Sequence, residues 1–90
     1  MHQPIINNIK FRMASSSSNV FAWASFVVDD WLYLNNIAIM FSQHTGNPYL
    51  RYPMLFTERG KYSHYKPLTK ESGQHITTEV LQELDKVLDL

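Results

Sequence analysis

The sequence contains no cysteine, which excludes disulfide bonds and thiolate metal sites and leaves the redox compartment unreadable from cysteine usage. Its three glycines lie far apart and form no loop of the kind that cradles phosphate. No apolar run approaches the roughly 20 residues that a membrane-spanning helix needs. These shortages argue against a disulfide scaffold, a phosphate-loop nucleotide binder and a helical membrane protein.

An arrangement of side chains that would predict catalysis is also lacking. The serine-rich stretch 13–19 predicts a flexible loop, which cannot hold a nucleophile in a fixed geometry, and no Gly-x-Ser-x-Gly motif is present. We therefore expect no enzymatic activity, no metal, no cofactor and no small-molecule substrate. The four histidines lie in separate segments without metal-ligand spacing: His2, His44, His64 and His75.

The amino terminus lacks the basic region and the following apolar stretch that mark a secretory signal peptide. Together with the absence of a long apolar run, this predicts a soluble cytoplasmic protein without membrane contact.

The formal net charge of the whole chain is zero, but the charged residues are unevenly distributed along it. Residues 1–70 contain seven Lys and Arg against three Asp and Glu, a net of +4, whereas residues 71–90 contain one Lys against five acids, a net of −4. A basic body is compatible with a local nucleic-acid-binding face. The same division also arises when a helix exposes an acidic side to solvent, so charge alone leaves both interpretations open.

What the sequence does contain is the composition of one small folded domain over residues 1–90, with 44% hydrophobic and 13% aromatic residues. A chain this short buries a limited core, so pairing with a second copy is plausible from size alone. The pattern predicts an α+β fold, in which a small antiparallel sheet of about five strands within residues 4–68 precedes one helix at about 70–88. The expected strands are 5–13, 19–28, 31–41, 49–56 and 61–68.

Two interruptions divide the largely apolar stretch 23–39. Asp29 and Asp30 follow a run of β-branched and aromatic residues, and their short side chains hydrogen-bond to nearby backbone, so we predict a hairpin corner. An adjacent carboxylate pair also suits metal binding or acid–base work, but no third ligand or partner histidine lies nearby. At Asn35 and Asn36 the apolar alternation slips by one residue, which predicts a β-bulge.

Apolar residues recur at helical spacing within residues 70–88, which predicts an amphipathic helix with one buried side. Thr69 or Ser72 can cap its start. Gly73 weakens the first turn, so we expect regular helix only after it. The predicted buried side consists of Ile76, Val80, Leu84 and either Val87 or Leu88, with Leu81 beside them.

Tyrosines and basic residues interleave in the segments 49–53 and 59–66. Such a mixture can stack nucleic-acid bases on the rings while Arg and Lys contact phosphates. Tyrosines in strands also pack across a sheet, so both roles stay open for them. Pro53 has no amide donor and belongs at an edge or an end of a strand. The tyrosines concerned are Tyr49, Tyr52, Tyr62 and Tyr65.

The segment 22–39 carries an ordered set of motifs. It reads Ala-x-Ala-Ser-Phe, then an acidic pair, then alternating apolar residues that end in Asn-Ile-x-Ile. This order resembles the SpoVG family (stage V sporulation protein G, or septation protein), whose pattern runs Ala-x-Ala-Ser-Ile, an acidic corner, Phe-Val-Val and Asp-Ile-x-Val. The resemblance covers nearly the whole chain. Its later matches are Pro53 seven residues before Gly60, then Tyr62, Pro67, Ile76 and Val80-Leu81.

The resemblance implies a small antiparallel sheet followed by one helix, in a homodimer that forms by association of the sheets. Family members are bacterial, lack enzymatic activity, and bind DNA and RNA as regulators of gene expression, with links to sporulation, septation and virulence. For this chain it implies a non-enzymatic nucleic-acid-binding regulator.

The chain departs from the family where nucleic-acid binding is concerned. The family proline precedes a serine and two basic residues, whereas Met54, Leu55 and Phe56 follow Pro53 here, and Gly73 stands where the family helix carries Arg. Basic residues supply most nucleic-acid affinity, so binding has to rest on neighbouring positions. The alternative is a dimeric interaction module of the same fold that has lost binding and uses the apolar segment 54–56 as a contact patch. The candidate nucleic-acid-binding residues are Arg51, Arg59, Lys61, Lys66 and Lys70.

Overall fold

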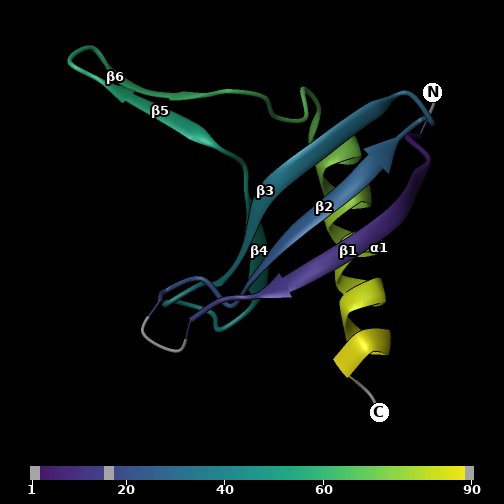
Figure 1. Cartoon of the computed structure of the whole chain (residues 1–90). Coiled ribbons are helices and arrows are strands. Elements are labelled where there is room, and N and C mark those ends of the chain that lie inside the picture. Colours follow the sequence, from purple (N-terminus) through teal and green to yellow (C-terminus); the bar gives the residue numbers. More distant parts are fainter. Residues whose placement is uncertain (1–2, 16–17, 89–90) are drawn as a thin grey trace.

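The computed structural model describes residues 3–15 and 18–88 and has an α+β fold, in which antiparallel strands precede one C-terminal helix (Figure 1). The first three strands and the helix agree with the ranges predicted from the sequence, apart from a few residues at their ends. The elements are β1 Ile6–Met13, β2 Ala22–Val28, β3 Leu32–Phe41, β4 Pro48–Arg51, β5 Met54–Thr57, β6 Gly60–Ser63 and α1 Lys70–Leu88.

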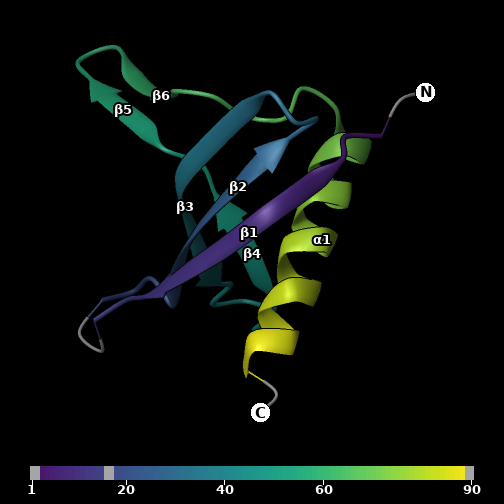
Figure 2. The ribbon, with the colours of Figure 1, turned by 45° about the vertical axis from the view of Figure 1, so that its right-hand side comes forward.

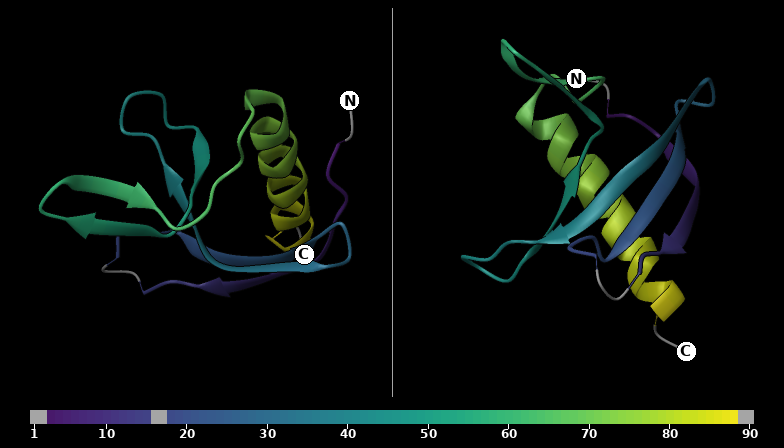
Figure 3. Two further views of the ribbon diagram at one scale, coloured as in Figure 1. Left: turned by 90° about the horizontal axis from the view of Figure 1, so that it is seen from above. Right: turned by 60° about the vertical axis from the view of Figure 1, so that its left-hand side comes forward.

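Strands β1 to β4 form one antiparallel sheet in the order β1-β2-β3-β4, so each strand pairs with its neighbours in sequence. Helix α1 lies against one face of this sheet (Figures 1 and 2). Seen from above, sheet and helix form two layers, and the β5–β6 hairpin extends beyond them (Figure 3). The predicted α+β fold, an antiparallel sheet followed by one helix, is confirmed. Of the described strands, four form the main sheet where about five were expected, and β5 and β6 form a separate two-stranded sheet.

The predicted strand 49–56 is broken at Tyr52 and Pro53, which connect β4 to β5. Proline has no amide hydrogen and restricts the residue before it, so the β4 ladder cannot continue through this point. The carbonyl of Pro53 instead accepts a hydrogen bond of 2.8 Å from the amide of His64, which closes the base of the β5–β6 hairpin. The last strand is also shorter than predicted, because β6 ends at Ser63 rather than near residue 68.

The hairpin corner predicted at Asp29 and Asp30 is confirmed, with positive φ angles of 54° and 64° at the two residues. Positive φ at both central residues is the signature of the turns that best match strand twist. The corner also holds the start of the chain. The amide of Ile5 donates to Oδ1 of Asp29 over 2.9 Å, the Asp29 amide donates to the Ile5 carbonyl over 2.8 Å, and the side-chain amide of Asn7 donates to Asp30 over 2.8 Å.

The β-bulge predicted in β3 is confirmed as well. The register of β2 and β3 shifts between Ala24 and Phe26, so that Asn35 and Asn36 together face the single residue Ser25. Asn36 has a φ of 57°, a left-handed conformation that asparagine adopts more readily than most residues.

A second bulge, not predicted, lies in β1. The register of β1 and β2 shifts between Asn7 and Lys10, and Asn8 has a φ of 52°. The tripeptide Asn-Asn-Ile occurs at both bulges, at residues 7–9 and 35–37, and in each case the second asparagine takes the positive φ angle. The repeat was a usable signal in the sequence.

The core lies between α1 and the face of the sheet that the helix covers. Its largest fully buried side chains are Phe26, Ile37, Ile39 and Val80. The predicted buried side of the helix is confirmed at Ile76, Val80 and Leu84, and Leu81 is partly buried against the same cluster. Val87 and Leu88 are about half exposed and lie beyond the core.

The helix begins at Lys70, so the expectation that regular helix starts only after Gly73 is wrong. Thr69 explains the earlier start, because its Oγ1 accepts a 3.1 Å hydrogen bond from the amide of Ser72 and so satisfies one of the free donors of the first turn. Pro67 lies opposite Gly73, where an added Cβ would stand 3.6 Å from the Pro67 Cβ.

Candidate nucleic-acid interface

The face of the four-stranded sheet that points away from α1 is accessible and has a distinct composition. Successive side chains of a strand point to opposite faces. In β2, Ala22, Ala24 and Phe26 belong to the buried core, so Trp23 and Ser25 point to the other side, which we call the open face.

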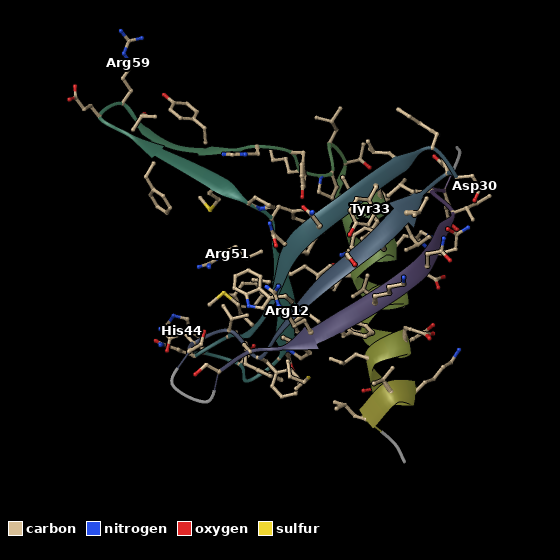
Figure 4. All side chains as sticks on the ribbon, in the orientation of Figure 1. Arg12, Asp30, Tyr33, His44, Arg51 and Arg59 are labelled. Atoms are coloured by element: carbon tan, nitrogen blue, oxygen red, sulfur yellow. The ribbon has the colours of Figure 1, made fainter. Side chains whose placement is uncertain are left out.

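One line of paired residues crosses all four strands on this open face. Arg12 in β1 pairs with Trp23 in β2, Trp23 pairs with Ala38 in β3, and Ala38 pairs with Arg51 in β4. We call these four residues the cross-strand row. Both arginines are exposed and Trp23 is half-buried. The row therefore places an aromatic ring between two permanently charged guanidinium groups, and Figure 4 shows both arginines near the same end of the sheet.

The row lines a hollow of about 410 Å³. Between Trp23 and Arg51, Ala38 contributes only a methyl group to the lining and is itself buried. The hollow lies within the roughly 300–1,000 Å³ typical of small-molecule pockets. Its other wall comes from the start of the β5–β6 hairpin. The lining residues outside the row are Asn36, Tyr52, Pro53, Met54 and Phe56.

A second, smaller hollow of about 220 Å³ continues along the open face and shares Arg12, Trp23 and Asn36 with the first. It adds Lys10 and Tyr33 to its lining, and the Tyr33 side chain is 62% exposed. Basic groups and aromatic rings thus alternate over the open face, which is the combination that single-stranded nucleic acids engage through phosphate contacts and stacking.

Charge separates the two sides of the molecule. Strands β1 to β4 carry Lys10, Arg12 and Arg51 and contain no Asp or Glu. The helix on the other side of the sheet is rich in acidic residues. Its Lys86 forms an ion pair with Glu83, with 3.7 Å between Nζ and Oε2. A phosphate backbone would therefore be attracted to the open face and repelled by the helix. The acids of α1 are Glu71, Glu79, Glu83 and Asp85.

The five candidates predicted from the sequence are not brought together. Arg51 belongs to the cross-strand row, whereas Arg59 lies at the tip of the β5–β6 hairpin, far from Arg51 (Figure 4). Lys66 and Lys70 line a separate hollow beside the first turns of α1. Lys61 lies in β6, and its side chain is outside the described part of the chain.

Sequence reasoning missed Lys10 and Arg12 as site residues. A signal existed, because Lys10 and Arg12 alternate with Phe11, which packs against the core. Alternation of that kind assigns both basic side chains to the solvent side of a strand. It does not reveal that Trp23 and Arg51 stand in line with Arg12, since that depends on the pairing of all four strands.

The four tyrosines that interleave with basic residues in segments 49–53 and 59–66 divide into two pairs. Tyr52 and Tyr65 pack edge to face, with ring centroids 6.3 Å apart, and both contact the core. Burial raises the pKa of Tyr52 to about 12, and the neighbouring Tyr65 adds to the shift. Burial also raises the pKa of Tyr65. Tyr49 and Tyr62, by contrast, are 42% and 50% exposed, so packing accounts for the first pair only.

No protein-family model matches the chain, and no curated protein matches it either. The described residues include no helix long and apolar enough to cross a membrane. Within residues 3–15 and 18–88, no three His, Asp or Glu side chains gather in a group that could hold a metal ion.

Proposed function

We propose that this chain is a SpoVG-like regulator of gene expression that binds nucleic acid, DNA or RNA, through the open face of its sheet. The observation that carries the proposal is the cross-strand row, in which Arg12 and Arg51 flank Trp23 on strands that contain no Asp or Glu. Arginine binds phosphate through a planar fork of donors, and an aromatic ring between two such groups suits a base between two phosphates.

The resemblance of the sequence to the SpoVG family supports the biological class. It favours a non-enzymatic role in sporulation or septation control, in the cytoplasm of a bacterial cell. The proposed binding surface does not use the positions at which family members carry basic residues and this chain does not. In this proposal Arg12 and Arg51 take the place of the basic pair expected after Pro53, and Lys10 extends the charged surface along β1.

A mobility-shift assay with paired charge reversals tests this surface. The double variant Arg12→Glu, Arg51→Glu should abolish binding at physiological salt. Lys66→Glu, Lys70→Glu is the matched control, because it changes the net charge by the same amount on the helix side of the molecule. Over a salt series, the logarithm of the binding constant falls as the logarithm of the salt concentration rises. The slope is about −0.9 for each phosphate contact on duplex DNA and about −0.7 on single strands. Binding that survives reversal of the row but not reversal of the control pair would reject the open face.

Arg59 and Lys61 are a third pair for the same assay. They lie near the tip of the β5–β6 hairpin, beyond the hollow that the base of the hairpin borders. Reversal of both to Glu should weaken binding less than reversal of the row and flatten its salt slope. Lys86→Glu, on the acidic helix, should leave binding unchanged.

We propose further that the chain acts as a homodimer. The β5–β6 hairpin extends away from the two layers and carries Phe56 and Tyr62, which are 68% and 50% exposed. Exposed aromatic surface and the open edges of β1 and β4 are both stabilised when a second chain covers them. A dimer would present the row twice, which matters because single phosphate contacts are weak.

Light scattering at micromolar concentration should give about twice the 10.5 kDa chain mass. A monomer at that concentration would remove the dimer from the proposal. The second candidate function, a protein-interaction module without nucleic-acid binding, is favoured by the apolar wall that Met54 and Phe56 form beside the row. A dimer that binds no nucleic acid at low salt would decide for that candidate.

A further inference from the structure

We infer that the hollow of the cross-strand row receives an unpaired base, which stacks on Trp23 while Arg12 and Arg51 hold the flanking phosphates, so that the chain prefers single strands to duplex. This inference rests on the proposed function and names the class of nucleic acid that the same surface takes.

The first argument is the shape of the hollow. Neighbouring strands lie about 4.8 Å apart, so the indole of Trp23 stands one strand from Arg12 and two strands from Arg51. Ala38 fills the intervening position with a methyl group only, and Met54 and Phe56 close the far side. The result is a hollow with apolar walls and a positive charge towards either end. A nucleobase has the matching form, since its faces are apolar and its neighbouring phosphates are anionic.

The second argument is the chemistry available to the edge of such a base. The Asn36 side chain lines both hollows of the open face and offers an amide donor and a carbonyl acceptor. Unpaired bases are read on their edges by such groups while their faces stack on aromatic rings. Asn36 belongs to the bulge of β3 and has a φ of 57°, so the backbone conformation of the bulge fixes its position.

The third argument concerns duplexes. In a duplex both faces of each base are covered by its neighbours, and an indole can reach a face only after the base leaves the stack. Trp23 is half-buried in the surface of a sheet, so it cannot be inserted between stacked base pairs in the way that a protruding side chain can. A base therefore has to come to Trp23, which unpaired strands allow at little cost.

The rival geometry is the β5–β6 hairpin. A two-stranded ribbon fits the major groove of B-form DNA, and Arg59 lies near the tip of this one. Recognition of that kind would favour duplex DNA and would depend on Arg59 rather than on Trp23. The two geometries therefore make opposite predictions for the same pair of variants.

Tryptophan fluorescence provides a direct test, because the sequence contains two tryptophans. The other, Trp31, lies just before β3 at the Asp29–Asp30 corner and is 77% exposed. In a Trp31→Phe background, Trp23 is the sole reporter. Titration with a pool of random-sequence single strands of about 12 nucleotides, a length that single-strand-binding domains cover, should quench its emission. The same pool as RNA and as DNA duplex completes the set of probes.

Affinity measurements on substitution variants complete the test. Trp23→Leu should weaken single-strand binding about 5- to 140-fold, the range expected for one lost stacked base, and leave duplex binding nearly unchanged. Trp23→Phe keeps a ring and should recover most of the loss, which separates stacking from a general effect on folding. Trp31→Leu is the matched control and should change neither affinity.

The outcomes also separate this inference from the proposed function. Binding that requires Arg12 and Arg51, is equal for single strands and duplex and is indifferent to Trp23→Leu would overturn the unpaired-base site and leave the open-face proposal standing. Duplex preference together with loss on Arg59→Glu would assign binding to the hairpin instead. Failure to bind any of the probes at low salt would overturn both.

Discussion

The hydroxyl of Tyr65 donates a hydrogen bond to the backbone carbonyl of Asn35, and so ties the segment that returns from the β5–β6 hairpin to the bulge of β3. The ring of Tyr65 packs against that of Tyr52. The hydroxyl of Tyr52 is itself buried, but it finds no hydrogen-bond partner within residues 3–15 and 18–88. Two tyrosines in contact thus differ in whether their polar atom is satisfied.

This difference predicts opposite effects of the same substitution. Tyr65→Phe should lower the free energy of unfolding by about 0.5–1.5 kcal/mol, the usual net value of one hydrogen bond. Tyr52→Phe should leave it unchanged or raise it, because it removes a buried hydroxyl that gains no bond. Urea denaturation of both variants measures the effect. An equal loss in both would mean that the Tyr52 hydroxyl is bonded in solution.

Tyr52 also predicts a dependence of stability on alkaline pH. Its pKa in the folded chain is about 12, against an ordinary value of 10.0, because burial disfavours the phenolate. Below about pH 10 the group is protonated in both states and its contribution is constant. As the pH rises from about 10 towards 12, the unfolded chain loses this proton first, so the free energy of unfolding declines.

Denaturation midpoints measured across that pH range should fall more steeply for the wild-type chain than for Tyr52→Phe. An absorbance titration should find a phenolate signal near pH 12 that the variant lacks. Identical alkaline profiles for the two proteins would contradict the assignment.

The two bulges predict a strong dependence on residue type at Asn8 and Asn36, whose φ angles are 52° and 57°. Valine is strained in this conformation, and a left-handed residue with a Cβ costs roughly 1–2 kcal/mol. Asn8→Val and Asn36→Val should therefore destabilise the fold by about that amount, whereas the corresponding glycine variants should be nearly neutral. Thermal unfolding of the four variants decides it, and tolerance of valine at either site would show that the bulge is not required there.

The acidic corner is predicted to be structural. Asp29→Asn with Asp30→Gly keeps a side-chain carbonyl that can accept the Ile5 amide, and Asn-Gly is the favoured pair for a turn with two positive φ angles. The double variant should preserve both the fold and nucleic-acid binding, measured by circular dichroism and mobility shift. Loss of binding in a folded variant would identify the corner as a functional acidic pair.

The parts of the fold that were predictable are those determined by residues close together in the sequence. Adjacent carboxylates after an apolar run marked the corner, and the slipped alternation around Asn36 marked one bulge. The bulge at Asn8 was not predicted, because the adjacent Ile5 and Ile6 define no alternation before it. Pro53 predicted the end of a strand. It did not predict the direction in which the chain continues after β4, because that direction depends on packing against the remainder of the fold.

The candidate site was less predictable, for a physical reason. Arg12 and Arg51 stand far apart in the sequence and are aligned only through the pairing of β1 with β2, β2 with β3 and β3 with β4. Register is a property of strand pairs, and two of these three pairings contain a bulge. A charge pattern along the chain therefore favoured a cluster of neighbours in sequence, such as Arg59 and Lys61, over residues that meet across the sheet.

The bulges act on residue parity. In an uninterrupted strand, all side chains that face the helix would be even-numbered or all odd-numbered. Here Ile6 and Phe11 both pack against the core, as do Leu34 and Ile39, so parity is reversed once within β1 and once within β3. If β1 kept all its residues but lost its bulge, the strand could bury Ile6 or Phe11 but not both. If Ile6 kept its place, Arg12 would be turned towards the helix, so the side on which the molecule is positively charged is decided at Asn8.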